Sequence, residues 1–247
     1  MNILWSKTGS NGNCSVIELS DKSIFMIDAG IKLDIVNKKI GYKLSQIKKA
    51  FVTHTHKDHS GYIDKLLTRG ITVYMPINSV PNLPNKDYYI KGIKSEQLTF
   101  DNLIVRPFPL IHTNGDGTNC ENYGYLFLDK GNGEKMLWAT DTHFIPQKFP
   151  PCEIYALECN YSDAEENIDY LESEHETKEL IVEKRRLVSH QSLEALLMFL
   201  KKQDLSKCRE IRLLHISGAE KQKLNNWIDR IFKELGNKLN EGVTIIG

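Results

Sequence analysis

Short apolar stretches separated by glycine, asparagine and aspartate run through the first two thirds of the chain. Valine, isoleucine, phenylalanine and tyrosine gather in these stretches, and such runs between turn-forming residues predict β-strands. The predicted strands cover residues 2–5, 14–19, 23–27, 50–53, 72–75, 98–100, 103–109, 123–128, 136–139 and 154–158. Residues 62–69 have a helical pattern that ends at Gly70. Residues 76–94, which hold three of the eight prolines, are expected to lack regular structure.

Helical patterns dominate the last third of the chain. Residues 163–184, 192–202 and 220–235 are predicted as helices, and residues 210–214 and 243–246 as strands. No repeat, low-complexity tract or linker interrupts the sequence, so we expect a single domain over residues 1–247. Strands and helices mixed in this order predict an α/β fold.

The composition is that of an ordinary globular protein, with 40% hydrophobic and 26% charged residues. No run approaches the roughly 18 apolar residues that a membrane-spanning helix needs. The first residues lack the basic start and apolar stretch of a signal peptide. Five scattered cysteines without a close pair argue against a disulfide framework. We therefore expect the protein to work in the reducing cytoplasm, without a membrane partner.

Charge is balanced overall but unevenly distributed. The formal net charge is +0, so it does not indicate a nucleic-acid-binding protein. Residues 32–49 contain six lysines against one acid, and residues 163–179 contain eight acids against one lysine. The lysines form either a solvated helix face or a basic rim that could hold a phosphate backbone. The acidic stretch could lie over a cleft and limit access for long DNA.

The most distinctive chemical feature is the run H-T-H-K-D-H from His54 to His59, directly after an apolar strand. Residues two apart in an extended segment face the same way, so His54 and His56 can present their imidazoles to one metal ion. A turn can then direct Asp58 and His59 to a second ion. Imidazole suits Zn²⁺, and added carboxylates also admit Mn²⁺ or Fe. The alternative is an exposed histidine-rich loop.

This run resembles the His-x-His-x-Asp-His signature of the metallo-β-lactamase superfamily, and the resemblance extends over roughly residues 2–218. Residues 26–30 resemble the superfamily's early strand, whose Asp28 would support the metal loop. Further along the chain, His112, Asp141 and His215 match its remaining ligands. Taken singly, they could also be a loop histidine, a turn cap and a core histidine.

The resemblance implies a four-layer αβ/βα sandwich that holds two divalent metal ions, Zn or Mn. One ion would be held by His54, His56 and His112. The other would be held by Asp58, His59 and His215, and Asp141 would bridge the two.

Two segments point to a branch of the superfamily. Residues 7–15 resemble the Gly-Ser-x-Gly-Asn-Cys turn of the WalJ-type (YycJ-type) proteins, a branch associated with 5′-to-3′ DNA exonuclease activity. An ordinary tight turn explains these residues equally well. Residues 187–192 resemble the His-x-Ser element of phosphodiesterase and nuclease branches, although Ser189 replaces the usual glycine. There His190 would protonate the leaving alkoxide, and Ser192 would bind a phosphate oxygen. A serine cap beside an exposed histidine is the alternative.

Together these resemblances imply a hydrolase in which a hydroxide that bridges two metals attacks a phosphodiester, with Asp58 and His190 as catalytic residues. The first hypothesis is a nuclease resembling a 5′-to-3′ DNA exonuclease. The second is a phosphodiesterase for a small substrate such as a cyclic nucleotide, which the zero net charge favours. A thioester, lactone or β-lactam hydrolase and a non-catalytic binding module are further alternatives. The oligomeric state is left open.

Overall fold

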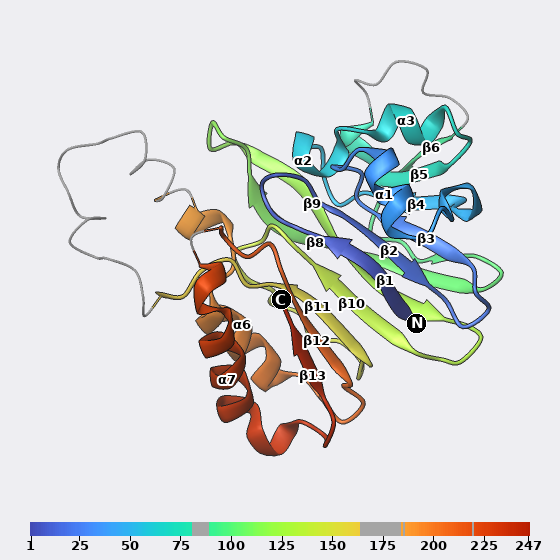
Figure 1. Cartoon of the computed structure of the whole chain (residues 1–247). Coiled ribbons are helices and arrows are strands. Elements are labelled where there is room, and N and C mark those ends of the chain that lie inside the picture. The colour runs from blue at the N-terminus through green and yellow to red at the C-terminus, as the bar shows by residue number, and fades with distance from the viewer. Residues whose placement is uncertain (81–88, 164–183, 185, 219) are drawn as a thin grey trace. The chain divides into compact units, whose positions relative to one another are not determined.

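The computed structural model describes residues 1–80, 89–163, 184, 186–218 and 220–247 (Figure 1). The chain packs into two compact units, each made of two segments. Unit 1 comprises Met1–Pro109 and Cys120–Trp138, and unit 2 comprises Leu110–Asn119 and Ala139–Gly247. Both units mix strands and helices, so the α/β class is confirmed. A single domain over residues 1–247 stays a prediction.

A six-stranded sheet forms one part of unit 1, in the order β1-β2-β3-β4-β5-β6. Its strands are β1 (Asn2–Lys7), β2 (Cys14–Glu18), β3 (Ile24–Ile27), β4 (Lys49–Phe51), β5 (Thr72–Pro76) and β6 (Ile90–Ile93). The first three pair antiparallel, and β3 to β6 pair in parallel. Parallel strands that are buried on both faces consist mainly of apolar residues, as in β3, where all four residues are buried.

Strand β6 lies inside residues 76–94, so the expectation of no regular structure there is wrong for this part. Its two isoleucines are three positions apart, with exposed Lys91 and Gly92 between them. That spacing lacks the alternation that marks a strand. The segment is a strand because its backbone pairs with β5, where Val73 lies opposite Ile90.

Short helices accompany this sheet. They are α1 (Leu33–Lys39), η1 (Leu44–Gln46), α2 (Lys57–Ser60), α3 (Ile63–Leu67) and η2 (Ile77–Ser79). Val36 of α1 and Leu66 of α3 belong to one hydrophobic cluster with Met26 and Val73 of the sheet. Burial of such side chains contributes roughly 1.5–3 kcal/mol each, so this cluster fixes the helices on the sheet.

The opposite face of the sheet packs on a second group of strands within unit 1. These are β7 (Leu98–Thr99), β8 (Leu103–Thr113), β9 (Asn119–Asp129) and β10 (Lys135–Ala139). The last residues of β8, the first residue of β9 and the last residue of β10 belong to unit 2. Phe25 lies 4.9 Å from Phe127, and Phe51 lies 5.8 Å from Tyr125, measured between ring centroids. These aromatic contacts make unit 1 a sandwich of two sheet layers with helices outside.

Strand β8 is longer than the predicted 103–109, because it continues to Thr113. Burial alternates at its end: Leu110 and His112 are buried, whereas Ile111 is exposed. Leu110 and Ile111 are both apolar, so the sequence does not show this alternation. His112 is therefore held on a strand, and only a short turn separates β8 from β9.

Unit 2 contains three parallel strands and the long helices. The strands are β11 (Ile154–Glu158), β12 (Glu210–Leu214) and β13 (Thr244–Ile246), and the helical elements are α6 (Leu193–Lys202), η4 (Lys221–Lys223), α7 (Leu224–Leu235) and η5 (Gly236–Lys238). Helices α6 and α7 lie on one face of these strands (Figure 1). The predicted elements at 154–158, 192–202, 210–214, 220–235 and 243–246 are confirmed.

Nearly all of the helix predicted over residues 163–184, and of the acidic stretch 163–179, lies outside the described residues. Over the residues that are described, no helix combines the length and apolar character needed to cross a bilayer.

Candidate metal centre

The histidine run of unit 1 begins at the carboxyl end of β4. Strand β3 lies parallel to β4 and ends beside it, which brings Asp28 next to the run. One carboxylate oxygen of Asp28 accepts hydrogen bonds from the backbone N–H (2.8 Å) and hydroxyl (2.9 Å) of Thr53. Its other oxygen lies 2.8 Å from Nδ1 of His59. The predicted supporting role of Asp28 therefore has a clear geometric basis.

The imidazoles of unit 1 lie close together. The ring of His54 lies 4.6 Å from that of His56 and 4.1 Å from that of His59. His59 is fully buried, and its Nε2 lies 3.5 Å from Oδ2 of Asp58. When Nδ1 donates to a carboxylate, Nε2 keeps its lone pair, as histidines that bind metal commonly do. His59 and Asp58 thus present one nitrogen and one carboxylate on the same side of α2.

Asn13, a residue that the sequence did not single out as part of the site, joins these two ligands. It is 1% exposed, and its amide nitrogen lies 3.1 Å from Oδ2 of Asp58 and 2.8 Å from Nε2 of His59. Its amide oxygen accepts the N–H of Gly9 at 2.8 Å. The glycine-rich turn between β1 and β2 therefore supports the metal loop through one buried amide.

Gly30 makes this approach possible. A side chain at Gly30 would overlap the carbonyl oxygen of Asp58 and would lie 2.8 Å from the backbone nitrogen of Asn13. Only glycine fits where three backbone segments meet so closely.

Unit 2 carries its own cluster of ligand-type side chains. Asp141, Glu158, His190 and His215 each offer one atom, and these four atoms all lie within 4.8 Å of one another. Nε2 of His215 lies 3.4 Å from Oδ1 of Asp141. The rings of His190 and His215 are stacked, with centroids 5.0 Å apart. The ring of His112 lies 5.8 Å from that of His190. Five site residues were predicted in unit 2. Four of them, namely His112, Asp141, His190 and His215, thus lie close together, and Ser192 is the exception.

Glu158 is the member of this cluster that the sequence did not identify as a site residue. Its side chain is fully buried, and Oε1 lies 2.6 Å from Nδ1 of His190. Burial lowers the pKa of His190, but the nearby carboxylates of Glu158 and Asp141 outweigh it and raise that pKa to about 9. The sequence could have pointed to Glu158, because it is the single carboxylate at the end of an otherwise apolar strand. A buried charge without a partner is costly, so a carboxylate at such a position is expected to have a partner.

Asn160 holds His215 in place, and it too was missed as a site residue. Its amide nitrogen donates to the carbonyl oxygen of His215 at 2.7 Å and lies 3.1 Å from Nδ1 of the same residue.

Ser192 has a structural role at the start of α6. Its hydroxyl accepts the backbone N–H of Ala195 at 3.2 Å and donates to the carboxylate of Asp163 at 2.8 Å. The residue is 3% exposed. This is the serine-cap alternative, and it explains Ser192 without a substrate. The predicted substrate contact gains no support from this geometry.

Backbone strain marks both clusters. Asp28 in unit 1 and Asp141 and His215 in unit 2 have φ values of 61°, 54° and 53°. Residues other than glycine adopt this left-handed conformation infrequently, although aspartate and histidine do so more often than most, and Lys22 and Tyr42 share it outside the clusters.

The donor set in both units fits divalent metals. Imidazole nitrogens and carboxylate oxygens predominate, and several of them are oriented by a second hydrogen-bonding partner, as in metal sites. No cysteine takes part in the clusters described above, and all five cysteines are buried as thiols.

Comparison with known proteins agrees with this chemistry. A family model described as the metallo-beta-lactamase superfamily matches residues 8–132, half of the chain. The anti-Pycsar protein Apyc1 of Bacillus phage 010DV004 is 22% identical over 166 residues, which cover 53% of this chain and 63% of that protein. The match thus spans less than two thirds of that relative's length.

Solved structures share the fold at low identity. Unliganded yeast PDE1 has a TM-score of 0.68 at 11% identity, covering 100% of this chain and 96% of its own. YhfI from Bacillus subtilis has a TM-score of 0.64 at 16% identity, covering 99% and 95%. The short form of human tRNase Z has a TM-score of 0.59 at 15% identity, covering 89% and 93%. Together with the family match and the two ligand clusters, they show that this chain has the α/β sandwich fold of the metallo-β-lactamase superfamily and belongs to that superfamily.

Proposed function

We propose that this protein is a metal-dependent phosphodiesterase that acts on nucleotides or nucleic acid. The observation that carries this proposal is the placement of His190, whose Nδ1 lies 2.6 Å from the buried carboxylate of Glu158 and whose ring stacks on that of His215 beside Asp141. Phosphodiester hydrolysis needs an acid for the leaving alkoxide, whereas thioester hydrolysis releases a thiolate that leaves without one. PDE1 and tRNase Z share the fold and carry the names of enzymes of this kind.

The seven ligands expected from the sequence are proposed to hold two divalent ions, Zn or Mn. His54, His56 and His112 would hold one ion; Asp58, His59 and His215 the other; and Asp141 would bridge them. When bound, such ions lower the pKa of water and offset negative charge on phosphoryl oxygens.

The chain's own residues would supply the remaining chemistry. His190 would give the proton on its imidazole to the leaving oxygen, since a positioned acid typically contributes roughly 10²–10⁴-fold to rate. Glu158 would keep that proton in place and set which ring nitrogen faces the substrate. Asp28 and Asn160 would orient His59 and His215. In this scheme Asp58 contributes to catalysis by holding one of the two ions.

Among phosphodiesters, the lysines favour a small substrate over long DNA. Lys48 and Lys49 lie at the amino end of β4, whereas His54 follows its carboxyl end. Lys48 contacts the carbonyl of Ser45, and Lys49 lies over the ring of Phe100. Helix α1 follows β3, and Lys38 and Lys39 lie in its last turn. They are therefore at the end of the helix that is farther along the chain from Asp28. A basic rim at the metal loop therefore does not form from most of these lysines.

The proposed substrate is accordingly a small nucleotide phosphodiester. A nuclease of the WalJ type with 5′-to-3′ polarity is the second candidate, supported by the turn at residues 7–15 and the element at residues 187–192. A reducing compartment such as the cytoplasm suits the five buried thiols.

A substrate panel tests the proposal. Cyclic nucleotides, end-labelled single- and double-stranded DNA, bis(4-nitrophenyl) phosphate, a thioester and a lactone would be incubated with the protein in Mn²⁺ and in Zn²⁺. We expect phosphodiester turnover that Asp58→Ala reduces by at least about 100-fold on every phosphodiester of the panel. His190→Ala should cause a loss of that size on the cyclic nucleotides and DNA, whose leaving alkoxides need a proton, and a much smaller loss on bis(4-nitrophenyl) phosphate. His143→Ala is the matched control, because His143 is an exposed histidine outside the clusters. Turnover of the thioester or lactone alone, or undiminished phosphodiester cleavage by Asp58→Ala, would refute it.

A further inference from the structure

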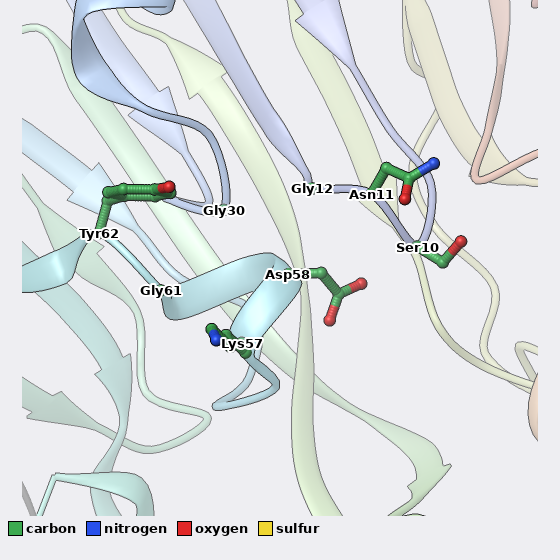
Figure 2. Close-up of a pocket in the computed structure, with 8 residues that line it drawn as sticks. All are labelled: Ser10, Asn11, Gly12, Gly30, Lys57, Asp58, Gly61 and Tyr62. Carbon is green, nitrogen blue, oxygen red and sulfur yellow. The ribbon is translucent and has the colours of Figure 1, made fainter.

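A pocket of about 410 Å³ lies beside the metal loop of unit 1 (Figure 2). The turn that carries Ser10 and Asn11 forms one end of it, and Tyr62 lies at the other end. Lys57 and Asp58, at the start of α2, lie between them. This volume falls within the range of about 300–1,000 Å³ typical of sites for small molecules.

The backbone at Gly12, which lines this pocket, leaves no room for a side chain. Gly12 has a φ of 123°, and a side chain there would come within 2.5 Å of the carbonyl oxygen of Gly30. Its amide donates to the carbonyl of Gly9 at 2.9 Å, which closes the turn. Gly12 and Asn13 are buried, whereas Ser10 and Asn11 are exposed. The turn therefore presents two exposed polar side chains next to a buried part of the backbone.

Four polar side chains around the pocket have no partner within the described part of the chain. They are the hydroxyl of Ser10, the amide of Asn11, the ammonium group of Lys57 and the hydroxyl of Tyr62. By contrast, the neighbouring Asn13 amide makes several hydrogen bonds. Ser10, Asn11 and Lys57 are exposed and line the pocket together with Tyr62, so their polar groups are available to a ligand there.

The chemistry of these groups defines the ligand. The ring of Tyr62 offers a flat aromatic face, on which a nucleobase can stack. Lys57 is a cation that can pair with a phosphate, and Ser10 and Asn11 can donate to phosphate or sugar oxygens. Asp58, a proposed metal ligand, forms part of the wall, so an occupant lies directly beside the proposed reaction centre.

We propose that this pocket binds the nucleoside part of a nucleotide substrate, with the base on Tyr62 and its phosphate near Lys57, Ser10 and Asn11. This inference rests on the proposed phosphodiesterase function and adds to it the site that recognises the nucleotide.

Binding of nucleoside 5′-monophosphates, measured by titration calorimetry on the purified full chain, tests this inference directly. Base stacking on an aromatic ring is strong enough that Tyr62→Ala should raise the Kd about tenfold or more. Tyr62→Phe keeps the ring and should stay within about twofold of the wild type. Lys57→Ala should weaken binding of the monophosphate more than binding of the unphosphorylated nucleoside.

Lys65→Ala is the matched control for Lys57→Ala, because Lys65 is an exposed lysine on α3 outside the pocket. Its Kd should equal that of the wild type. Urea unfolding of each variant identifies any loss of folding, and Tyr62→Phe keeps the test decisive if Tyr62→Ala unfolds.

The inference is overturned if the wild type binds no nucleoside monophosphate, or if Tyr62→Ala and Lys57→Ala bind it as tightly as the wild type. Hydrolysis of bis(4-nitrophenyl) phosphate by the same preparation tests the proposed function separately, because that ester carries no nucleoside. Turnover of this ester without nucleotide binding would refute the pocket alone, and nucleotide binding without turnover of any phosphodiester would refute the function.

Discussion

Replacing Gly30 by alanine should displace the metal loop of unit 1 and destabilise the fold around it. The added carbon would overlap the carbonyl oxygen of Asp58. It would also lie 2.8 Å from the backbone nitrogen of Asn13, which donates to that same carbonyl at 2.6 Å. Both obstacles are backbone atoms, so no side-chain rotation can relieve the overlap.

The cost follows from the hydrogen bonds that meet at this point. Besides the bond from Asn13 to Asp58, Gly30 donates to the carbonyl of Asn13 at 2.8 Å, and Ala29 donates to that of His59 at 2.6 Å. A typical hydrogen bond contributes about 0.5–1.5 kcal/mol net, and overpacking alone typically costs about 1–3 kcal/mol. Loss of two such bonds together with overpacking gives a destabilisation of roughly 4 kcal/mol.

Urea unfolding and metal analysis would measure both consequences. Gly30→Ala should lower the free energy of unfolding by about that amount, and the displaced loop should bind less metal per chain than the wild type. Gly218→Ala is the control, because a side chain at Gly218 would meet no atom of the described residues within 4 Å. It should change the free energy of unfolding by less than about 0.5 kcal/mol.

An alanine variant at Gly30 with wild-type stability and a full complement of metal would show that the junction of these three segments can relax. The close packing of Asp58 against the β1–β2 turn would then not be what holds the metal loop.

Three further predictions concern the acid, the helix cap and the metals. Glu158→Gln should lower kcat by roughly 10²-fold or more on alkyl phosphodiesters. The loss should be much smaller on 4-nitrophenyl esters, because their leaving group needs no proton. Equal losses on both kinds of ester would contradict the role of His190 as the acid. Ser192→Ala should lower the free energy of unfolding by about 1 kcal/mol through loss of the α6 cap, measured in urea, whereas a raised KM at unchanged stability would restore its predicted substrate contact. Removal of metal with a chelator should lower the midpoint of thermal unfolding, since an ion present at about 1,000 times its Kd stabilises the folded state by about 4 kcal/mol; an unchanged midpoint would argue against a bound ion in the folded chain.

The sequence predicted those features that depend on local order. The strands and helices with clear apolar periodicity were predicted within a few residues, and the run from His54 to His59 indicated a metal site because its ligands are adjacent in the chain. The family resemblance extended this set to Asp141 and His215, which the structure places with His190 in one cluster.

What the sequence could not show depends on pairing between distant segments. Strand β6 exists through its register with β5, and Ser192 looks alike in the sequence as a helix cap or as a phosphate ligand. Asn13 lies 45 residues before Asp58, and Glu158 lies 32 residues before His190. The lysines of residues 32–49 form a cluster in sequence, but Lys38 and Lys39 lie in the last turn of α1, and Lys48 and Lys49 lie at the amino end of β4, opposite to the end that the histidine run follows.

The left-handed backbone at Asp28 and Asp141 has a consequence for how this chain can change over generations. A single-base change converts an aspartate codon into a glycine codon, and glycine would relieve strain on the order of 1–2 kcal/mol at each position. At Asp28 that gain is offset, because the buried carboxylate accepts two hydrogen bonds from Thr53, and a buried donor left without a partner costs about 1–3 kcal/mol. Glycine is therefore one mutation away at Asp28, but stability does not favour it, since the same carboxylate holds both Thr53 and the ring of His59.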